Sequence, residues 1–254
     1  MLEQRLPMLA KWSLYALGAT EGKRTQATDA VAAWLLRHHP SLLPSVPQPE
    51  VFSTIRVRTE LVDRMVTDLI DRARNARQKM VLWSIGGGFD SRWHRLVPEH
   101  TDVVSEVIEV ESPSILELKA KLLTPSPYIG SWMRVGRVEA EEADWTVRAR
   151  HKGIPLVVLE AGAGRLEEGA LGLLLQRIRY DAPDAKVIVG LPADTGVRDR
   201  RWSQHRLAGL GWRVEEDIRV AARSRLVAPG GREMSPGMYP FRLALLSPRE
   251  SLQS

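Results

Sequence analysis

The chain has 254 residues, 44% of them hydrophobic and 26% charged, which is an ordinary composition for a globular protein. Its length suits one large α/β domain with additions, or two small domains. It contains no cysteine, so disulfides, thiolate catalysis and cysteine-ligated metal centres are excluded. The formal net charge is +5, but the arginines are scattered among acids, which argues against a nucleic-acid partner. Since the sequence shows neither an apolar run of membrane-spanning length nor a secretory signal pattern, we expect no membrane partner and a cytoplasmic protein.

The first part of the chain, residues 1–79, has the apolar spacing of helices separated by breaks. A capped helix is predicted over residues 28–36, and a second over residues 58–77. The prolines of residues 40–49 are incompatible with regular structure between them. We predict that residues 1–79 form a helical lid over the acceptor, within the same domain as a core at residues 80–254.

After residue 80, strand-like runs alternate with helical segments, a pattern typical of a parallel sheet. No long helix fits between residues 219 and 237, so the last strand should be reached by a hairpin and run antiparallel. We therefore predict an α/β fold with a seven-stranded, mostly parallel, Rossmann-like sheet whose last strand is antiparallel. The expected strands are 80–85, 103–109, 132–138, 154–160, 185–191, 212–218 and 238–246, and the expected helices among them are 112–123, 165–180 and 198–210.

The most informative segment follows the first predicted strand. An α/β sheet commonly builds a nucleotide pocket from a glycine turn at the carboxyl end of that strand, because glycine lets a ligand approach the main chain. A dinucleotide fingerprint needs a third glycine where Ser91 stands, and no phosphate-binding Gly-Lys-Ser/Thr follows. The turn favours S-adenosylmethionine, whose sulfonium would suit Asp90, although a purely structural turn is the alternative. Its glycines are Gly86, Gly87 and Gly88.

An acid also stands where the second predicted strand ends. Glu109 lies about 20 residues after the glycine turn, the spacing at which an acid binds the ribose hydroxyls of a nucleotide. A solvent-exposed acid at a strand end is the alternative interpretation. Both position and residue type favour a role in ligand binding.

Five segments of the chain occur in an order that resembles the signature segments of the leucine carboxyl methyltransferase family. The resemblance covers roughly residues 15–246 and implies S-adenosylmethionine as cofactor and S-adenosylhomocysteine as product. The family includes phosphatase carboxyl methyltransferases and bacterial carboxyl O-methyltransferases of polyketide pathways. The segments are Arg58-Thr59-Glu60-Leu61-Val62-Asp63, Ser84 to Arg92 followed by Arg95-Leu96, Glu109 to Pro113 followed by Lys119, Val138-Glu139-Ala140 ahead of Asp144-Trp145, and Pro155 to Glu160.

The resemblance implies roles for several charged residues around the cofactor. The methionyl carboxylate would be bound by Arg58, because a guanidinium can hold a carboxylate with two hydrogen bonds. Glu109 would take the ribose, Glu139 would lie near the adenine amine, and Glu160 would lie beside the reacting centre. Further candidates are Glu111 for the ribose, and Arg56, Lys23 or Arg24 for the carboxylate.

The chain departs from the family pattern in the loop that normally lines the acceptor pocket. Ala161 replaces a glycine, and Arg165 stands where a tyrosine is common. An arginine there would either bind an acidic substrate or face solvent at the start of the next helix. These departures leave the identity of the acceptor undetermined.

Three hypotheses about the chemistry follow. A carboxylate acceptor is ionised at neutral pH and needs no general base, so positioning alone can promote methyl transfer. A hydroxyl acceptor would need a base, for which the candidates are His94, His151 and His205. A non-catalytic binding protein with the same fold is the third. The acceptor is expected to be a small acid or alcohol, free or bound to a carrier.

Overall fold

Seven strands form one sheet in the order β3-β2-β1-β4-β5-β9-β6, and all run parallel except β9, which is antiparallel to both of its neighbours. In this computed structural model the described residues are 30–40, 49–123, 135–139, 153–159, 168–191, 202–220, 227–228, 232–233 and 241–249. The mostly parallel sheet with a reversed last strand confirms the predicted fold class. Its strands are β1 (Met80–Ile85), β2 (Val104–Glu111), β3 (Val135–Glu139), β4 (Ile154–Leu159), β5 (Lys186–Leu191), β6 (Trp212–Val220) and β9 (Phe241–Pro248).

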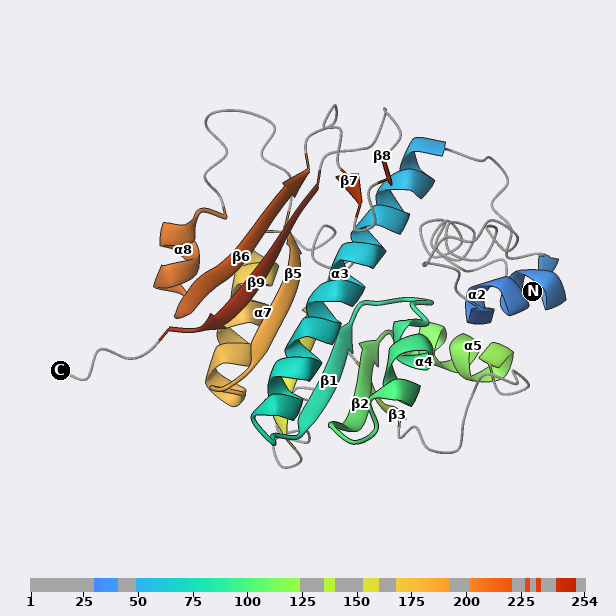
Figure 1. Cartoon of the computed structure of the whole chain (residues 1–254), viewed down its shortest axis with the longest axis horizontal. Helices are drawn as coiled ribbons and strands as arrows, with labels where there is room; N and C mark the ends of the chain where they lie inside the picture. The colour runs from blue at the N-terminus through green and yellow to red at the C-terminus, as the bar shows by residue number, and fades with distance from the viewer. Residues whose placement is uncertain are drawn as a thin grey trace.

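Helices cover the sheet, as Figure 1 shows. Two strands of two residues, β7 (Val227–Ala228) and β8 (Arg232–Glu233), pair separately from the sheet in a hairpin that the sequence did not predict. No described helix is both long and apolar enough to cross a membrane. The helices are α2 (Ala30–His38), α3 (Pro49–Asn75), α4 (Arg92–Leu96), the 3-10 turn η3 (Val97–Glu99), α5 (Pro113–Leu123), α7 (Glu168–Asp181) and α8 (Gln204–Gly209).

Alternate residues of the strands point to opposite faces of the sheet, so continuous apolar strands build two cores. On one face, Met80 and Leu82 of β1 pack with α3, whose apolar stripe covers this face (Figure 1). The stripe repeats at helical spacing, as predicted. It consists of Leu61, Val62, Met65, Val66, Leu69, Ile70 and Ala73.

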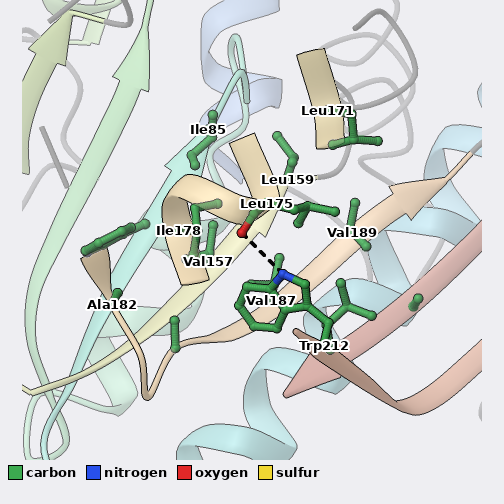
Figure 2. Packing of buried hydrophobic residues seen from close by; sticks show 14 of the residues in the cluster. Ile85, Val157, Leu159, Leu171, Leu175, Ile178, Ala182, Val187, Val189 and Trp212 are labelled. Atoms are coloured by element: carbon green, nitrogen blue, oxygen red, sulfur yellow. Dashed lines mark hydrogen bonds between the residues drawn. The ribbon is translucent and has the colours of Figure 1, made fainter. Parts of the chain in front are cut away.

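The opposite face packs against α7 (Figure 2). Val81 and Trp83 of β1 point to this side, because they alternate with Met80 and Leu82. The indole N–H of Trp212 donates to the carbonyl oxygen of Leu175 at 3.2 Å, so β6 and α7 are also joined by a buried hydrogen bond. The described tryptophans are all buried, which removes large apolar rings from water; they are Trp34, Trp83, Trp93, Trp202 and Trp212.

Several helices begin or end at other residues than predicted, and proline explains two of these boundaries. Helix α3 begins at Pro49 rather than residue 58, because proline fits the first turn of a helix, where its missing N–H needs no partner. The helix after the glycine turn, α4, has only five residues and passes into η3 at Pro98, which cannot donate the next helical hydrogen bond. Helix α8 is shorter than predicted, although residues 192–201 lie outside the described part.

Helix α2 packs beside the glycine turn rather than on the sheet. Trp34 and Leu35 of α2 lie in a separate core with Phe89, which follows the three glycines. The helix ends at His38, whose ring stacks on Trp34 at 4.4 Å between ring centroids and whose Nδ1 lies 2.9 Å from the Trp34 carbonyl oxygen. The amino-terminal part of the chain is thus in contact with the turn.

At the β6 edge of the sheet, a buried arginine of β9 forms an ion pair with a partly buried aspartate of β6. The side chain of Arg242, 2% exposed, donates from Nε to Asp217 Oδ1 at 2.7 Å and from Nη1 to the carbonyl oxygen of Trp202 at 2.7 Å. Burial raises the pKa of Asp217, but hydrogen bonds from Arg242 and Arg219 outweigh it and hold the pKa below its ordinary value. The pair stabilises this edge when the carboxylate is ionised.

Candidate functional site

The glycine turn after β1 has a backbone that only glycine adopts readily. Gly86 and Gly88 have φ angles of 64° and 56°, in the left-handed region that other residues avoid. A Cβ on Gly87 would lie 2.6 Å from Ser84 Oγ, so a larger residue would require either the Ser84 hydroxyl or the turn to move. The backbone angles thus favour glycine at positions 86 and 88, and the space beside Ser84 favours it at position 87. Without side chains, the three residues leave the main chain accessible.

The turn lies at the point where the order of strands reverses. From β1 the chain proceeds outward to β2 and β3, and then returns to β4 on the other side of β1. The Gly86 amide donates to the Val110 carbonyl oxygen at 2.9 Å, so the turn stays attached to the end of β2. Open α/β sheets bind ligands beyond the carboxyl ends of their strands at such a reversal.

Glu111, the last residue of β2, fastens the turn from the side. Its Oε2 accepts a hydrogen bond from the Gly88 amide and its Oε1 accepts one from the Ser112 amide, both at 2.9 Å. An ionised carboxylate has about four acceptor positions, so two remain for a ligand that donates. This geometry suits a pair of neighbouring hydroxyl groups, such as those of a ribose.

Glu109 lies two residues earlier on the same strand and is more deeply placed. It is 7% exposed and forms a buried ion pair with Lys119 of α5, which is 3% exposed. The Lys119 ammonium also donates to the main-chain carbonyl oxygen of Asp90 at 2.9 Å. The acid for which the sequence predicted a role at the ribose therefore already has a protein partner.

These groups surround a small pocket beside the turn. Its volume is about 180 Å³, counting space open to solvent. Its walls are Ser84, Gly87, Gly88, Glu109, Val110, Glu111, Leu116 and Lys119.

A network of ion pairs holds the segment that follows the turn. The buried Arg92 guanidinium donates from Nε to Asp63 Oδ1 of α3 at 2.5 Å and from Nη1 to Asp90 Oδ2 at 2.7 Å. Arg95 adds a bond to Asp63 Oδ2 at 2.5 Å. Asp90 Oδ1 also accepts from the Arg92 amide at 2.9 Å. Both carboxylate oxygens of Asp90, which the sequence suggested for a sulfonium, are thus bonded to Arg92.

Two other predicted ligands lie at the same edge of the sheet. Arg58 is half-buried on α3, about 7.5 Å along the helix from Asp63 toward its amino end. That end projects toward the carboxyl ends of the strands, because α3 finishes just before β1 begins. Glu139 ends β3, and its backbone is paired in register with that of Glu111. Arg56 is half-buried on the same helix.

Of the remaining predicted residues, one lies away from the turn, one follows it directly, and the others lie outside the described part. His205 is exposed on α8, beside the edge strand β6, with β4, β5 and β9 between β6 and β1 (Figure 1). His94 is half-buried on α4, directly after the turn. The residues outside the described part are Lys23, Arg24, His151, Glu160, Ala161 and Arg165.

Sequence reasoning gave Lys119 no role of its own. A signal was present, because Lys119 occupies the apolar stripe of α5, four residues after Ile115 and three before Leu122, both buried. A lysine in such a stripe must find a partner. The contact of Asp63 with Arg92 had no such signal, because 29 residues separate them.

The comparisons with known proteins agree with this geometry. Residues 19–155, more than half of the chain, match the family model of leucine carboxyl methyltransferase. A search of curated proteins gave no match. The structure is similar to that of a proposed methyltransferase from Thermobifida fusca YX, at 15% identity and a TM-score of 0.58 over 98% of this chain and 97% of the other. It is also similar to magnesium protoporphyrin IX methyltransferase from Synechocystis PCC 6803 with bound SAM, at 10% identity and a TM-score of 0.53, covering 96% and 98% of the two chains.

Proposed function

Because the chain belongs to the leucine carboxyl methyltransferase family, whose members are S-adenosylmethionine-dependent methyltransferases, we propose that it methylates a carboxylate of a small molecule or biosynthetic intermediate. One observation carries the proposal most directly. A bare glycine turn at the strand reversal lies beside Glu111, whose carboxylate keeps two acceptor positions. This combination suits a nucleoside with a free ribose.

The residues fit the cofactor at this end of the site. The missing side chain of Gly87 leaves main-chain atoms accessible, and Glu111 would accept from the ribose hydroxyls. The Glu109 carboxylate lines the same pocket, but its bond to Lys119 makes Glu111 the better candidate for the ribose. Arg58 for the methionyl carboxylate and Glu139 near the adenine stay predictions that their places in the fold support.

Two further assignments have less support. The carboxylate of Asp90 is bonded to Arg92, so its effect on a sulfonium would be electrostatic and would not come from a free side chain. Glu160 directly follows β4, the neighbour of β1, which supports a place near the reacting centre. Arg165 and His205 stay as acceptor-side candidates from the sequence.

Methyl transfer to a carboxylate requires the protein mainly to position the two reactants. The bound cofactor supplies an activated methyl group on a sulfonium. An acceptor carboxylate is ionised at neutral pH, so this chain needs no general base for it. The protein's part is to hold the two reactants in line and to exclude water.

The amino-terminal part of the chain is proposed to close the site over the acceptor. Contacts of α2 with Phe89 support this role, because they join that helix to the glycine turn. Helix α3 has a mixed role, since its apolar stripe belongs to the core while Arg58 and Asp63 lie near the site. We propose that residues 1–79 are part of the methyltransferase domain.

Calorimetry with S-adenosylmethionine and S-adenosylhomocysteine tests the cofactor. We expect saturable binding by the wild-type chain and a large loss in Arg58→Ala. The matched control is Arg72→Ala, an exposed arginine near the other end of α3, which should bind as the wild type does. Absence of binding at millimolar ligand would refute the proposal.

Product chemistry tests the acceptor. Small carboxylic acids and alcohols are offered with a cofactor labelled on the methyl group, and the labelled products are treated with mild alkali. A methyl ester releases its label, whereas a methyl ether retains it, so retention would favour a hydroxyl acceptor. Cofactor binding without turnover on any acceptor would favour a non-catalytic binding protein.

A further inference from the structure

We propose that Lys119 is a positioning residue, whose ammonium group, paired with the buried Glu109 carboxylate, holds the glycine turn in the shape that binds the cofactor. This inference rests on the proposed function and adds two residues to its site. It gives Glu109 a different part from the one expected at the ribose.

The contacts of Lys119 join three elements. The side chain comes from α5 and its Nζ donates to the carboxylate of Glu109 on β2. The same Nζ donates to the carbonyl oxygen of Asp90 at 2.9 Å. Asp90 closes the glycine turn, because its amide donates to the Gly87 carbonyl oxygen at 3.0 Å. A single ammonium group therefore fixes the end of the turn to the helix and strand that form the pocket wall.

Burying the ion pair of Glu109 and Lys119 costs free energy. Ions lose their hydration on burial, and a well-packed apolar pair often serves stability equally well. The neighbours of Lys119 on its stripe are Ile115 and Leu122, so a leucine would suit packing alone. The bond to the Asp90 carbonyl is something that an apolar side chain cannot provide.

The glycine turn needs such support because it has little of its own. Glycine has the greatest backbone freedom of any residue and no side chain to pack. Polar contacts from outside hold the turn at its third glycine and at its end: Glu111 accepts from the Gly88 amide, and Lys119 donates to the Asp90 carbonyl oxygen. Fixing a binding segment in its bound shape strengthens binding, because less freedom is lost when the ligand arrives.

Three variants test the role by calorimetry with S-adenosylhomocysteine and by thermal unfolding. Lys119→Met should weaken binding by about tenfold or more. Lys121→Met, an exposed lysine on the same helix, is the control and should bind as the wild type does. The double variant Glu109→Gln with Lys119→Met removes both buried charges, and should unfold nearer to the wild-type temperature while still binding weakly.

The double variant separates positioning from a merely structural ion pair. It also serves if Lys119→Met alone does not fold, because it leaves no unpaired buried charge. Recovery of affinity to within about twofold of wild type in the double variant would overturn the inference, as would unchanged affinity in Lys119→Met. A wild-type chain that binds no S-adenosylhomocysteine would overturn the proposed function itself and this inference with it.

Discussion

The guanidinium of Arg92 lies 2.5 Å, Nε to Oδ1, from the carboxylate of Asp63, although 29 residues separate them. Asp63 belongs to the long helix before the sheet, and Arg92 follows the glycine turn. Two of the sequence segments that resemble the family signature thus meet in one ion pair. The contact ties α3, and with it Arg58, to the turn.

Removing this contact should weaken both the fold and the site. In Asp63→Asn, Arg92, whose side chain is 1% exposed, loses its ionised partner on α3 but keeps Asp90, so we expect a loss of about 1–3 kcal/mol in the free energy of unfolding. Denaturant unfolding measures it. Asp68→Asn on the same helix is exposed and should change stability by less than about 0.5 kcal/mol. Equal stability of the two variants would refute the role of the network.

Gly87→Ala should reduce cofactor binding, because its Cβ would approach Ser84 Oγ to 2.6 Å and either Ser84, which lines the pocket, or the turn must shift. The added variant Ser84→Ala removes that oxygen. If displacement of the turn causes the loss, the double variant should regain affinity for S-adenosylhomocysteine. If the new methyl group instead obstructs the ligand, the double variant will bind as weakly as Gly87→Ala, and the contact with Ser84 will not be the cause of the loss.

Glu111→Gln should affect ligands according to their hydroxyl groups. The wild-type chain should bind adenosine more tightly than 2′,3′-dideoxyadenosine, because Glu111 would accept from the ribose. Glutamine has one acceptor oxygen instead of two, so the preference should fall by about 1–2 kcal/mol, measured by calorimetry. Glu117→Gln, exposed on α5, is the control. An undiminished preference would assign the ribose to another residue.

Asp217→Asn should show how acid weakens the edge of the sheet. The pKa of Asp217 is lower in the folded chain, so its contribution is present above the unfolded pKa and is lost as pH falls through the folded pKa. At pH 7 the variant should lose roughly 2–4 kcal/mol, because buried Arg242 loses its counterion. The difference from wild type should shrink below about pH 4. A difference independent of pH would contradict this account.

Two glycines away from the site should respond oppositely to alanine. In Gly169→Ala on α7, the new methyl group meets no atom within 4 Å, and alanine favours a helix by up to about 1 kcal/mol. In Gly153→Ala, the Cβ would lie 2.5 Å from the Lys79 carbonyl oxygen and should destabilise the chain. Thermal unfolding measures both changes. A shift of the unfolding temperature in the same direction for both variants would contradict this prediction.

Much of the fold was determined by local pattern. Apolar runs such as residues 80–85 predicted strands, and the absence of a helix before residue 238 predicted that the last strand is reversed. Such patterns are local consequences of side-chain direction, period two in a strand and 3.6 in a helix. The boundaries were less certain, because Pro49 could start a helix as well as prevent one.

The sequence by itself located the glycine turn and the acids near it, because backbone freedom and charge are properties of single residues. Only the tertiary structure decided which acid has which partner. Glu109 and Glu111 differ by one strand repeat and point to the same face, yet Glu109 meets Lys119 and Glu111 meets the Gly88 amide. That division depends on where α5 packs and how the turn bends, and both follow from contacts between segments distant in the chain.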